Sequence, residues 1–188
     1  MKKFLSNFKS SAAELKNTRS LVLTGILTSV FILLDTYSFN PTPYLRINFA
    51  FIVLASVGMF FGPVPAAMAA LAGDFIGCIL SGKAPIIPLS VTAVMSGLLY
   101  GIMLYKKSGM KLIICSIIAR VIDSAVICLV FQTAILIKYN FMSPAKENLY
   151  LRYGKLSTEL VFFIPLMIFL MPAVQKLYEK NFRHKTRL

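Results

Sequence analysis

The sequence has few charged residues, few cysteines and almost no histidine. Charged side chains make up 14% of the 188 residues, whereas an ordinary soluble domain carries about 25%. Three cysteines and one histidine are too few for a disulfide framework and argue against a His/Cys metal site. These shortages exclude an ordinary soluble enzyme and a small disulfide-stabilised domain.

The common catalytic and nucleotide-binding motifs are also missing from the sequence. It contains no Gly-x-x-x-x-Gly-Lys-Ser/Thr phosphate loop, no Gly-x-Ser-x-Gly elbow and no His-Glu-x-x-His pair. The single histidine, His184, lies in the basic C-terminal tail, and the three cysteines lie in apolar runs, where cysteine behaves as a small hydrophobic residue. We therefore expect a protein that is not an enzyme, binds no metal or cofactor and does not hydrolyse ATP itself.

Long apolar runs dominate what the sequence does contain. Hydrophobic residues make up 57% of the chain, and the mean hydropathy is +0.76. A helix needs about 20 residues to cross about 30 Å of hydrocarbon. We predict an all-α integral membrane protein, a single domain over 1–188 with six transmembrane helices. The predicted spans are 20–34, 47–61, 66–80, 86–105, 112–137 and 160–174.

The basic residues indicate the orientation of these spans. The chain has 20 Lys and Arg against 7 Asp and Glu. These basic residues flank the spans and form no single soluble face, which excludes a nucleic-acid-binding surface. If the N-terminus lies inside, inner segments hold 13 of the 20, mostly in the N-terminal segment 1–19 and the tail 176–188. The positive-inside rule therefore predicts that both termini are cytoplasmic.

Three acidic or basic residues fall inside predicted spans, where charge is costly and usually functional. Arg120 and Asp123 are one helical turn apart in the fifth span. They form either a structural ion pair or part of a polar ligand cavity, and a proton relay would use the same residue types. Asp74, in the third span, is either a hydrogen-bond acceptor within the bundle or a ligand contact.

Two stripes of small residues predict close helix packing. Ala69, Gly73, Gly77 and Ser81 recur every fourth residue around Asp74, and internal packing is the favoured interpretation. The first span carries a second stripe at Gly25 and Ser29. That stripe serves either internal packing or the docking of a partner helix.

The predicted outer loops combine aromatic and basic residues. Such residues form an interfacial belt, or they close over a flat ring bearing carboxylates through stacking and charge-assisted hydrogen bonds. Arg152-x-x-Lys155 is the best candidate for an anion clamp, with a pair of snorkelling side chains as the alternative. The full set of candidate substrate-binding residues is Tyr37, Tyr44, Arg46, Asp74, Lys83, Arg120, Asp123, Gln132, Tyr139, Asn140, Arg152 and Lys155.

Several segments together resemble a known transporter family. The resemblance is carried by 18–29 (TRSLVLTGILTS), 46–55 (RINFAFIVLA), 58–67 (GMFFGPVPAA), 72–77 (AGDFIG) and 96–107 (SGLLYGIMLYKK). These segments resemble the substrate-binding (S) components of energy-coupling-factor (ECF) vitamin importers, most closely the folate branch. The resemblance covers 18–107 well and is looser beyond Leu112, where Arg152-x-x-Lys155 resembles the basic pair that opens the last helix.

The resemblance implies a mechanism and partners. An S component of this family binds a vitamin near the outer face, under the loops that follow the first, third and fifth helices. It works with a transmembrane coupling subunit and two cytoplasmic ATPases, in the plasma membrane of a prokaryote. Toppling of the S component carries the vitamin inward, and ATP resets the complex. Gly25 and Ser29 match the small residues that dock on the coupling subunit.

The identity of the ligand stays open at this point. Where folate members have an aromatic Phe-Pro-Gly-Phe-Thr-Leu-Ser-like segment before the fourth helix, this sequence reads PIIPLSVT over 85–92. A flat pterin ring would lose stacking partners there, so a different vitamin or precursor is an alternative. An autonomous proton-coupled carrier that uses Arg120, Asp123 and Asp74 is an alternative from another class.

Overall fold

A computed structural model describes the backbone over 2–37, 39–42, 45–47, 49–82, 84–139 and 146–180. Side chains are described for 7–37, 49–82, 84–139 and 160–180. All six predicted spans form helices. They are α2 (Thr18–Thr36), α3 (Ala50–Phe61), α4 (Pro63–Leu80), α5 (Ile87–Leu104), a continuous helix made of α6 (Met110–Ile122), η1 (Asp123–Gln132) and α7 (Thr133–Lys138), and α8 (Lys146–Tyr178).

Five of these helices are long and apolar enough to cross a membrane, and α3, with 12 residues, is shorter. At about 1.5 Å per residue, α3 spans only about 18 Å. Its sequence explains the length, because Gly62 ends the helix with a positive φ of 88° and Pro63 starts α4 at once. The predicted all-α membrane fold is therefore confirmed, with one span that crosses only part of the hydrocarbon.

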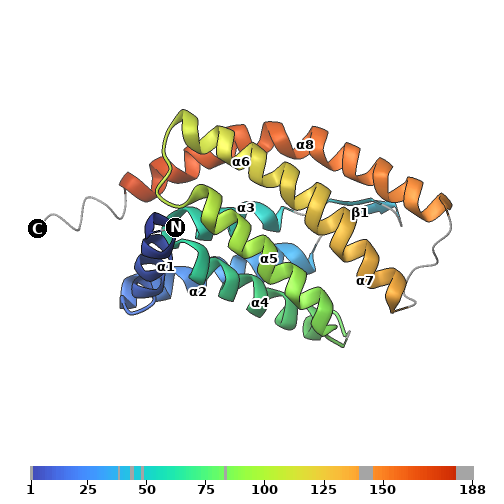
Figure 1. The fold of residues 1–188 in the computed structure, drawn as a ribbon, viewed down its shortest axis with the longest axis horizontal. Helices are drawn as coiled ribbons and strands as arrows, with labels where there is room; N and C mark the ends of the chain where they lie inside the picture. Colours follow the sequence, from blue (N-terminus) through green and yellow to red (C-terminus); the bar gives the residue numbers. More distant parts are fainter. Residues whose placement is uncertain are drawn as a thin grey trace, which may run out of the picture.

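The helices lie roughly along the long axis of the molecule in two groups (Figure 1). Helices α2 to α5 form one group, and α6, η1, α7 and α8 form the other on top of it. The N-terminus and the turn between α5 and α6 lie at one end, which we call the basic end. The strand β1, the end of α7 and the start of α8 lie at the other, which we call the hairpin end.

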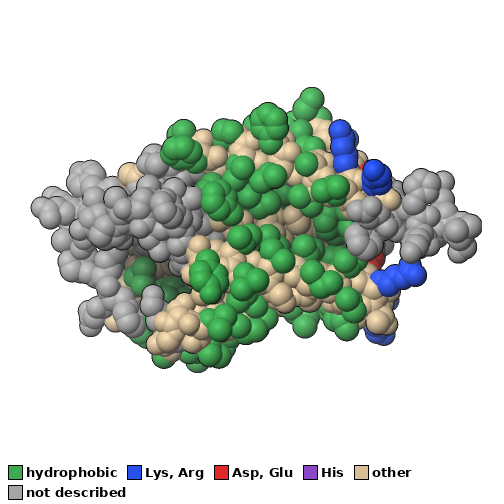
Figure 2. Space-filling model, turned by 180° about the vertical axis from the view of Figure 1, so that it is seen from behind, with side chains coloured by type: hydrophobic (Ala, Val, Ile, Leu, Met, Phe, Trp, Pro, Cys, Tyr) green, Lys and Arg blue, Asp and Glu red, His purple; other side chains and the backbone are tan. Residues whose placement is uncertain are grey.

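Side-chain type follows this division into ends (Figure 2). The middle of the molecule is covered with hydrophobic side chains, and the described Lys and Arg side chains gather at the basic end. Several helices carry exposed apolar side chains, among them Ile79, Val130 and Phe169. This pattern is that of a bundle whose sides face lipid and whose ends face water.

Two elements at the ends of the molecule were not expected from the sequence. A short antiparallel hairpin, β1 (Phe39–Thr42) and β2 (Leu45–Ile47), pairs Phe39 with Ile47 and Thr42 with Leu45 between α2 and α3. The N-terminal segment, expected only to be polar and basic, forms the helix α1 (Lys2–Glu14). The hairpin lies toward one end of the molecule, and α1 lies across the other (Figure 1).

A fully buried serine attaches α1 to the bundle. Ser11 donates a hydrogen bond of 2.8 Å to the carbonyl of Phe61 and accepts one of 3.1 Å from the amide of Val64. Those two backbone groups belong to the end of α3 and the start of α4, where helices leave groups without partners inside the helix. Ser11 therefore caps both helices at the turn that joins them.

Glycines let α3, α4 and α5 approach one another closely. A Cβ added at Gly58 would lie 2.8 Å from the backbone nitrogen of Gly101, and one at Gly97 would lie 2.5 Å from the carbonyl oxygen of Ala66. A Cβ at Gly101 would collide with the backbone of Pro63. Because the obstacles are backbone atoms, the side chains cannot rotate away and the helices themselves would have to separate.

We expect Gly101→Ala to destabilise the protein by about 1–3 kcal/mol, because even one methyl group overpacks this crossing. The measurement is thermal unfolding of the purified protein in detergent. Gly25→Ala is the matched control, since a Cβ at Gly25 has no described heavy atom within 4 Å, and its melting temperature should stay near that of the wild type. Equal melting temperatures for the two variants would contradict the prediction.

Candidate functional site: a polar network and a ligand-binding end

Arg120 and Asp123 meet inside the bundle and join its two helix groups. The guanidinium of Arg120 lies 3.2 Å from a carboxylate oxygen of Asp123. Asp123 also accepts hydrogen bonds from Tyr100, at 3.1 Å, and from Ser96, at 2.5 Å, both on α5. Arg120 is 7% exposed, Asp123 4% and Tyr100 0%. Three donors therefore surround one buried carboxylate.

Aromatic rings complete the surroundings of Arg120. Its guanidinium carbon lies 4.3 Å from the ring centre of Phe51 on α3 and 5.0 Å from that of Phe163 on α8. The two rings also contact each other, with centres 4.7 Å apart. Cation–π contacts of this kind add stabilisation when the cation is removed from water. The Arg120 side chain thus touches helices of both groups, which is the geometry of a structural lock.

The helix that carries this pair changes its hydrogen-bonding pattern directly after it. Asp123 is the first residue of η1, a π-helical segment of ten residues that ends at Gln132. Such segments are rare, occur mostly as single turns within α-helices, and are frequent at functional sites. The Oγ of Ser124 is buried and has no hydrogen-bond partner among the described residues. The predicted site residue Gln132 is half-buried where α7 begins.

Asp74 belongs to a separate polar pair between α4 and α5. One of its carboxylate oxygens accepts a hydrogen bond of 2.6 Å from Ser90 Oγ, and Asp74 itself is half-buried. Asp35, near the end of α2, lies close by: its carboxylate is 3.5 Å from where a Cβ at Gly77 would be. The half-exposed Asp74 can therefore serve the bundle and a ligand at once, whereas Asp123 is enclosed.

Several of the other predicted site residues lie in described segments at the hairpin end. Tyr37 caps α2 and is 81% exposed, and Tyr139 caps α7 and is 50% exposed. Arg46 lies in β2, and Arg152 and Lys155 lie in the first turns of α8. The side-chain contacts of six predicted site residues are not described, because the residues or their side chains lie outside the described part of the chain: Tyr44, Arg46, Lys83, Asn140, Arg152 and Lys155.

The two small-residue stripes have different surroundings. On α4, a Cβ at Gly73 would collide with the Phe31 ring of α2. Ala69, Gly73 and Gly77 are buried, so this part of the stripe packs inside the protein as the sequence favoured, whereas Ser81 is exposed at the end of α4. On α2, Gly25 and Ser29 are exposed. Large exposed side chains surround them, including Val22 at 54% and Ile26 at 55%. The α2 stripe is therefore open to a neighbour from outside the chain.

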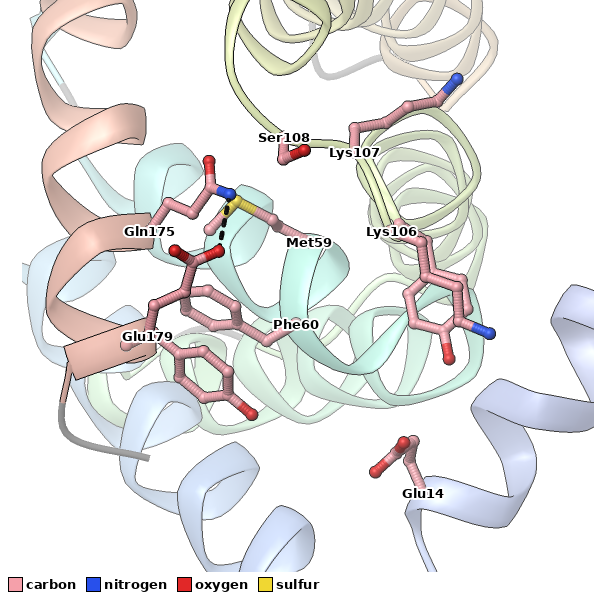
Figure 3. Close-up of a pocket in the computed structure, with 10 residues that line it drawn as sticks. Glu14, Met59, Phe60, Lys106, Lys107, Ser108, Gln175 and Glu179 are labelled. Carbon is pink, nitrogen blue, oxygen red and sulfur yellow. Dashed lines mark hydrogen bonds between the residues drawn. The ribbon is translucent and has the colours of Figure 1, made fainter. Parts of the chain in front are cut away.

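The described residues also line an open cavity of about 490 Å³ at the basic end, which the sequence did not predict (Figure 3). Its lining comes from α1, α3, the turn between α5 and α6, and α8. These elements are far apart in the sequence, and no local motif marks the lining residues. The cavity lies at the opposite end from the predicted vitamin site.

Fold and polar residues together define the class of this protein: a multi-pass membrane protein whose bundle carries polar groups between its helices. Residues 15–173 match the family model for the ECF-type riboflavin transporter, S component. The chain therefore belongs to this family of ECF S components, as the sequence resemblance indicated.

Two relatives are folate transporters. The chain is 27% identical over 94 residues to the Folate transporter FolT of Clostridium novyi (strain NT), a match that covers 50% of this chain and 55% of the relative. It thus spans about half the length of this curated relative. A crystal structure of FolT bound with folic acid superposes with a TM-score of 0.68 at 24% identity, over 84% of this chain and 91% of the other. This likeness shows the shared fold, and the resemblance to the folate branch is confirmed.

We expect Asp123→Asn to destabilise the protein by about 3–5 kcal/mol, because it leaves the Arg120 charge buried without its carboxylate. The double variant Arg120→Gln/Asp123→Asn keeps hydrogen-bonding groups but removes both charges, and it should recover most of the loss. Thermal unfolding in detergent measures both effects. A double variant as unstable as the single one would contradict the explanation by an uncompensated buried charge. Recovered stability with lost vitamin affinity would instead assign the pair to the ligand site.

Proposed function

We propose that this chain is the vitamin-binding S component of an ECF importer and that its ligand is folate or a related vitamin. Membership of the S-component family over residues 15–173 carries the proposal. Similarity to folate transporters in both sequence and fold supports folate as the ligand class. The chain works with a transmembrane coupling subunit and two cytoplasmic ATPases, which supply the energy that it cannot supply itself.

The proposed orientation in the plasma membrane of a prokaryote has both termini in the cytoplasm. Charge in the sequence supports it: 13 of the 20 Lys and Arg residues lie in the segments predicted to be cytoplasmic, and six lie in the predicted outer segments. Basic residues concentrate on the cytoplasmic side of membrane proteins. The hairpin end then faces outward, where a vitamin arrives.

In this orientation, the vitamin site lies at the hairpin end. Tyr37 and Tyr139 offer exposed rings for stacking, and Asp74 offers a carboxylate between α4 and α5. Arg152 and Lys155, at the start of α8, would bind a carboxylate of the ligand through charge-assisted hydrogen bonds. Tyr44, Arg46, Lys83, Gln132 and Asn140 complete the proposed site, with Arg120 and Asp123 below it.

Riboflavin is the second candidate ligand, favoured by the description of the matching family. The segment 85–92 lacks the aromatic residues that stack a pterin in the folate branch. Folate carries carboxylates and riboflavin does not, so only folate would depend on the basic pair at the start of α8. The two ligands therefore make different predictions for the same substitution.

We expect the purified chain, without partners, to bind folic acid and Arg152→Ala to weaken that binding by about 10- to 100-fold. Loss of one charge-assisted hydrogen bond is worth about 1.5–3 kcal/mol. Isothermal titration with folic acid, riboflavin and thiamine measures the preference. Lys176→Ala, at the far end of α8, is the control and should bind like the wild type. Tight riboflavin binding that Arg152→Ala leaves unchanged would contradict the folate assignment.

Transport assays separate the importer from the proton-coupled carrier. Proteoliposomes that contain the chain with its coupling subunit and ATPases should accumulate the vitamin only when ATP is supplied. Uptake by the chain alone under a proton gradient would overturn the proposed function, because an S component lacks its own energy source.

We expect Gly25→Leu to abolish assembly with the coupling subunit while vitamin binding is unchanged. Gly25 and Ser29 lie exposed on α2, where small residues let a second helix approach. Affinity purification of the tagged chain, followed by quantification of the partners, measures assembly. Ala173→Leu places the same large side chain at an exposed position of α8 and should assemble normally. An intact complex with Gly25→Leu would contradict docking through this stripe.

A further inference from the structure

The helix α6 carries a stripe of exposed residues that begins with a lysine at the basic end. Lys111, Ile114, Ile118 and Val121 are all exposed, and they recur every third or fourth residue, which places them on one face of the helix. Ala119, which faces the other way, is fully buried in the core. The stripe therefore lies on the outside of the bundle, where an apolar side chain meets lipid.

The C-terminal part of α8 repeats this arrangement. Phe162, Phe169, Ala173 and Lys176 are exposed at spacings that put them on one face of the helix, and Met167 on another face is fully buried. Phe169 is 81% exposed, so its ring lies against nothing inside the bundle. Toward the basic end, the outer face of α8 thus also changes from apolar side chains to a lysine.

The two lysines lie on neighbouring helices at the same end of the molecule. Helices α6 and α8 pack against each other, and Figure 1 shows the start of α6 and the end of α8 at the basic end. The turn before α6 and the end of α8 also line one cavity, through Ser108 and Gln175 among others. Lys111 and Lys176 follow these two residues closely in the sequence. A single phosphate between the helices is therefore within reach of both long side chains.

The positive charge on this face is not matched by described acidic groups. Among the described side chains, neither Lys111 nor Lys176 has an ion-pair partner. Glu179 also belongs to this end of the chain, but it lines the cavity and accepts a hydrogen bond of 3.1 Å from Gln175. Lys107, in the turn before α6, is exposed and adds a third positive charge. The face therefore attracts an anion.

A lipid fits this face better than a protein helix does. Bulky side chains such as Phe169 and Ile114 cover it, whereas helices that associate in a bilayer use small residues, and the exposed pair of these, Gly25 and Ser29, lies on α2 in the other helix group. At the end of a membrane helix, a lysine extends its amine to the level of the lipid headgroups. Lysine binds phosphate as a point charge, and basic pockets between membrane helices select anionic headgroups.

We propose that the face formed by α6 and α8 binds an anionic phospholipid, with its phosphate between Lys111 and Lys176 and its acyl chains along the two exposed stripes. This binding requires neither a vitamin nor a partner subunit, so the inference goes beyond the proposed function. In the proposed orientation, the lipid belongs to the cytoplasmic leaflet. The bound headgroup anchors the second helix group in the bilayer, since interfacial lysines help to set the tilt of a membrane helix.

The sequence contains no tryptophan, which allows a direct test. Ile114→Trp introduces a single fluorescent residue one turn from Lys111, at a position that is 51% exposed. The variant is reconstituted into vesicles of phosphatidylcholine mixed with brominated phosphatidylglycerol or with brominated phosphatidylcholine. Bromine quenches the tryptophan when the brominated lipid lies beside it. We expect phosphatidylglycerol to bind there about fivefold more tightly than phosphatidylcholine, which corresponds to about one lysine acting on an anionic headgroup.

The lysines are tested in the same Ile114→Trp chain. Lys111→Gln combined with Lys176→Gln should leave the fold intact, because both side chains are exposed, and should give the two lipids equal affinity. Lys138→Gln, at the other end of the same continuous helix, removes one charge far from this face and is the control. It should keep the preference for phosphatidylglycerol.

The inference is supported if the preference is present and only the lysine pair abolishes it. Equal quenching by both lipids in the Ile114→Trp chain would overturn it, as would a preference that survives Lys111→Gln/Lys176→Gln or one that Lys138→Gln also abolishes. Addition of the coupling subunit and ATPases should leave the quenching unchanged, and its loss would assign the face to a protein contact instead. None of these results bears on vitamin binding, so the proposed function stands or falls separately.

Discussion

The buried carboxylate of Asp123 is the interaction on which the arrangement of the two helix groups depends. It receives hydrogen bonds from α5 and from its ion-pair partner Arg120, whose guanidinium in turn lies against rings of α3 and α8. Charges cost much in an apolar interior unless each is matched. The hydrogen bonds and ion pair around Asp123 therefore favour one relative position of the two helix groups over others. Apolar packing between helices in a bilayer favours a single position only weakly.

The glycine contacts act within one helix group, whereas the polar network joins the two groups. They fix how α3, α4 and α5 cross within one group, through contacts of backbone with backbone. The short α3 and the turn at Gly62 and Pro63 leave no room for adjustment there. One group is thus rigid internally, and the polar network attaches the second group to it. This division leaves the hairpin end, where the vitamin is proposed to bind, built from segments of both groups.

The sequence predicted the parts of the structure that depend on local composition. Apolar runs of sufficient length predicted all six helices, and the gap between the predicted spans 47–61 and 66–80 coincides with the sharp turn at Gly62 and Pro63. The hairpin, the π-helical segment η1 and the position of α1 were not predicted. The pairing of Phe39 with Ile47 and the change from α-helical to π-helical hydrogen bonding at Asp123 depend on backbone geometry. The order of side chains in the sequence does not indicate that geometry.

The sequence indicated which residues of the candidate site are unusual, but not which residues contact one another. Charge inside a span identified Arg120, Asp123 and Asp74 as unusual, but their partners Tyr100, Ser96 and Ser90 come from another helix and carry no signal in the sequence. The cavity at the basic end was missed for the same reason. Glu14 and Glu179 are separated by nearly the whole chain, and each alone resembles an ordinary surface residue at the end of a helix.

The hydrogen bonds of Ser11 have a consequence for how the protein is made. Ser11 caps a turn that is 50 residues further along the chain, so α1 leaves the ribosome before its binding place exists. Until α2, α3 and the start of α4 have entered the bilayer, α1 has only the membrane surface to rest on. Its attachment is therefore a late event in biogenesis, and it occurs only after the first helix pair has been inserted with the correct topology.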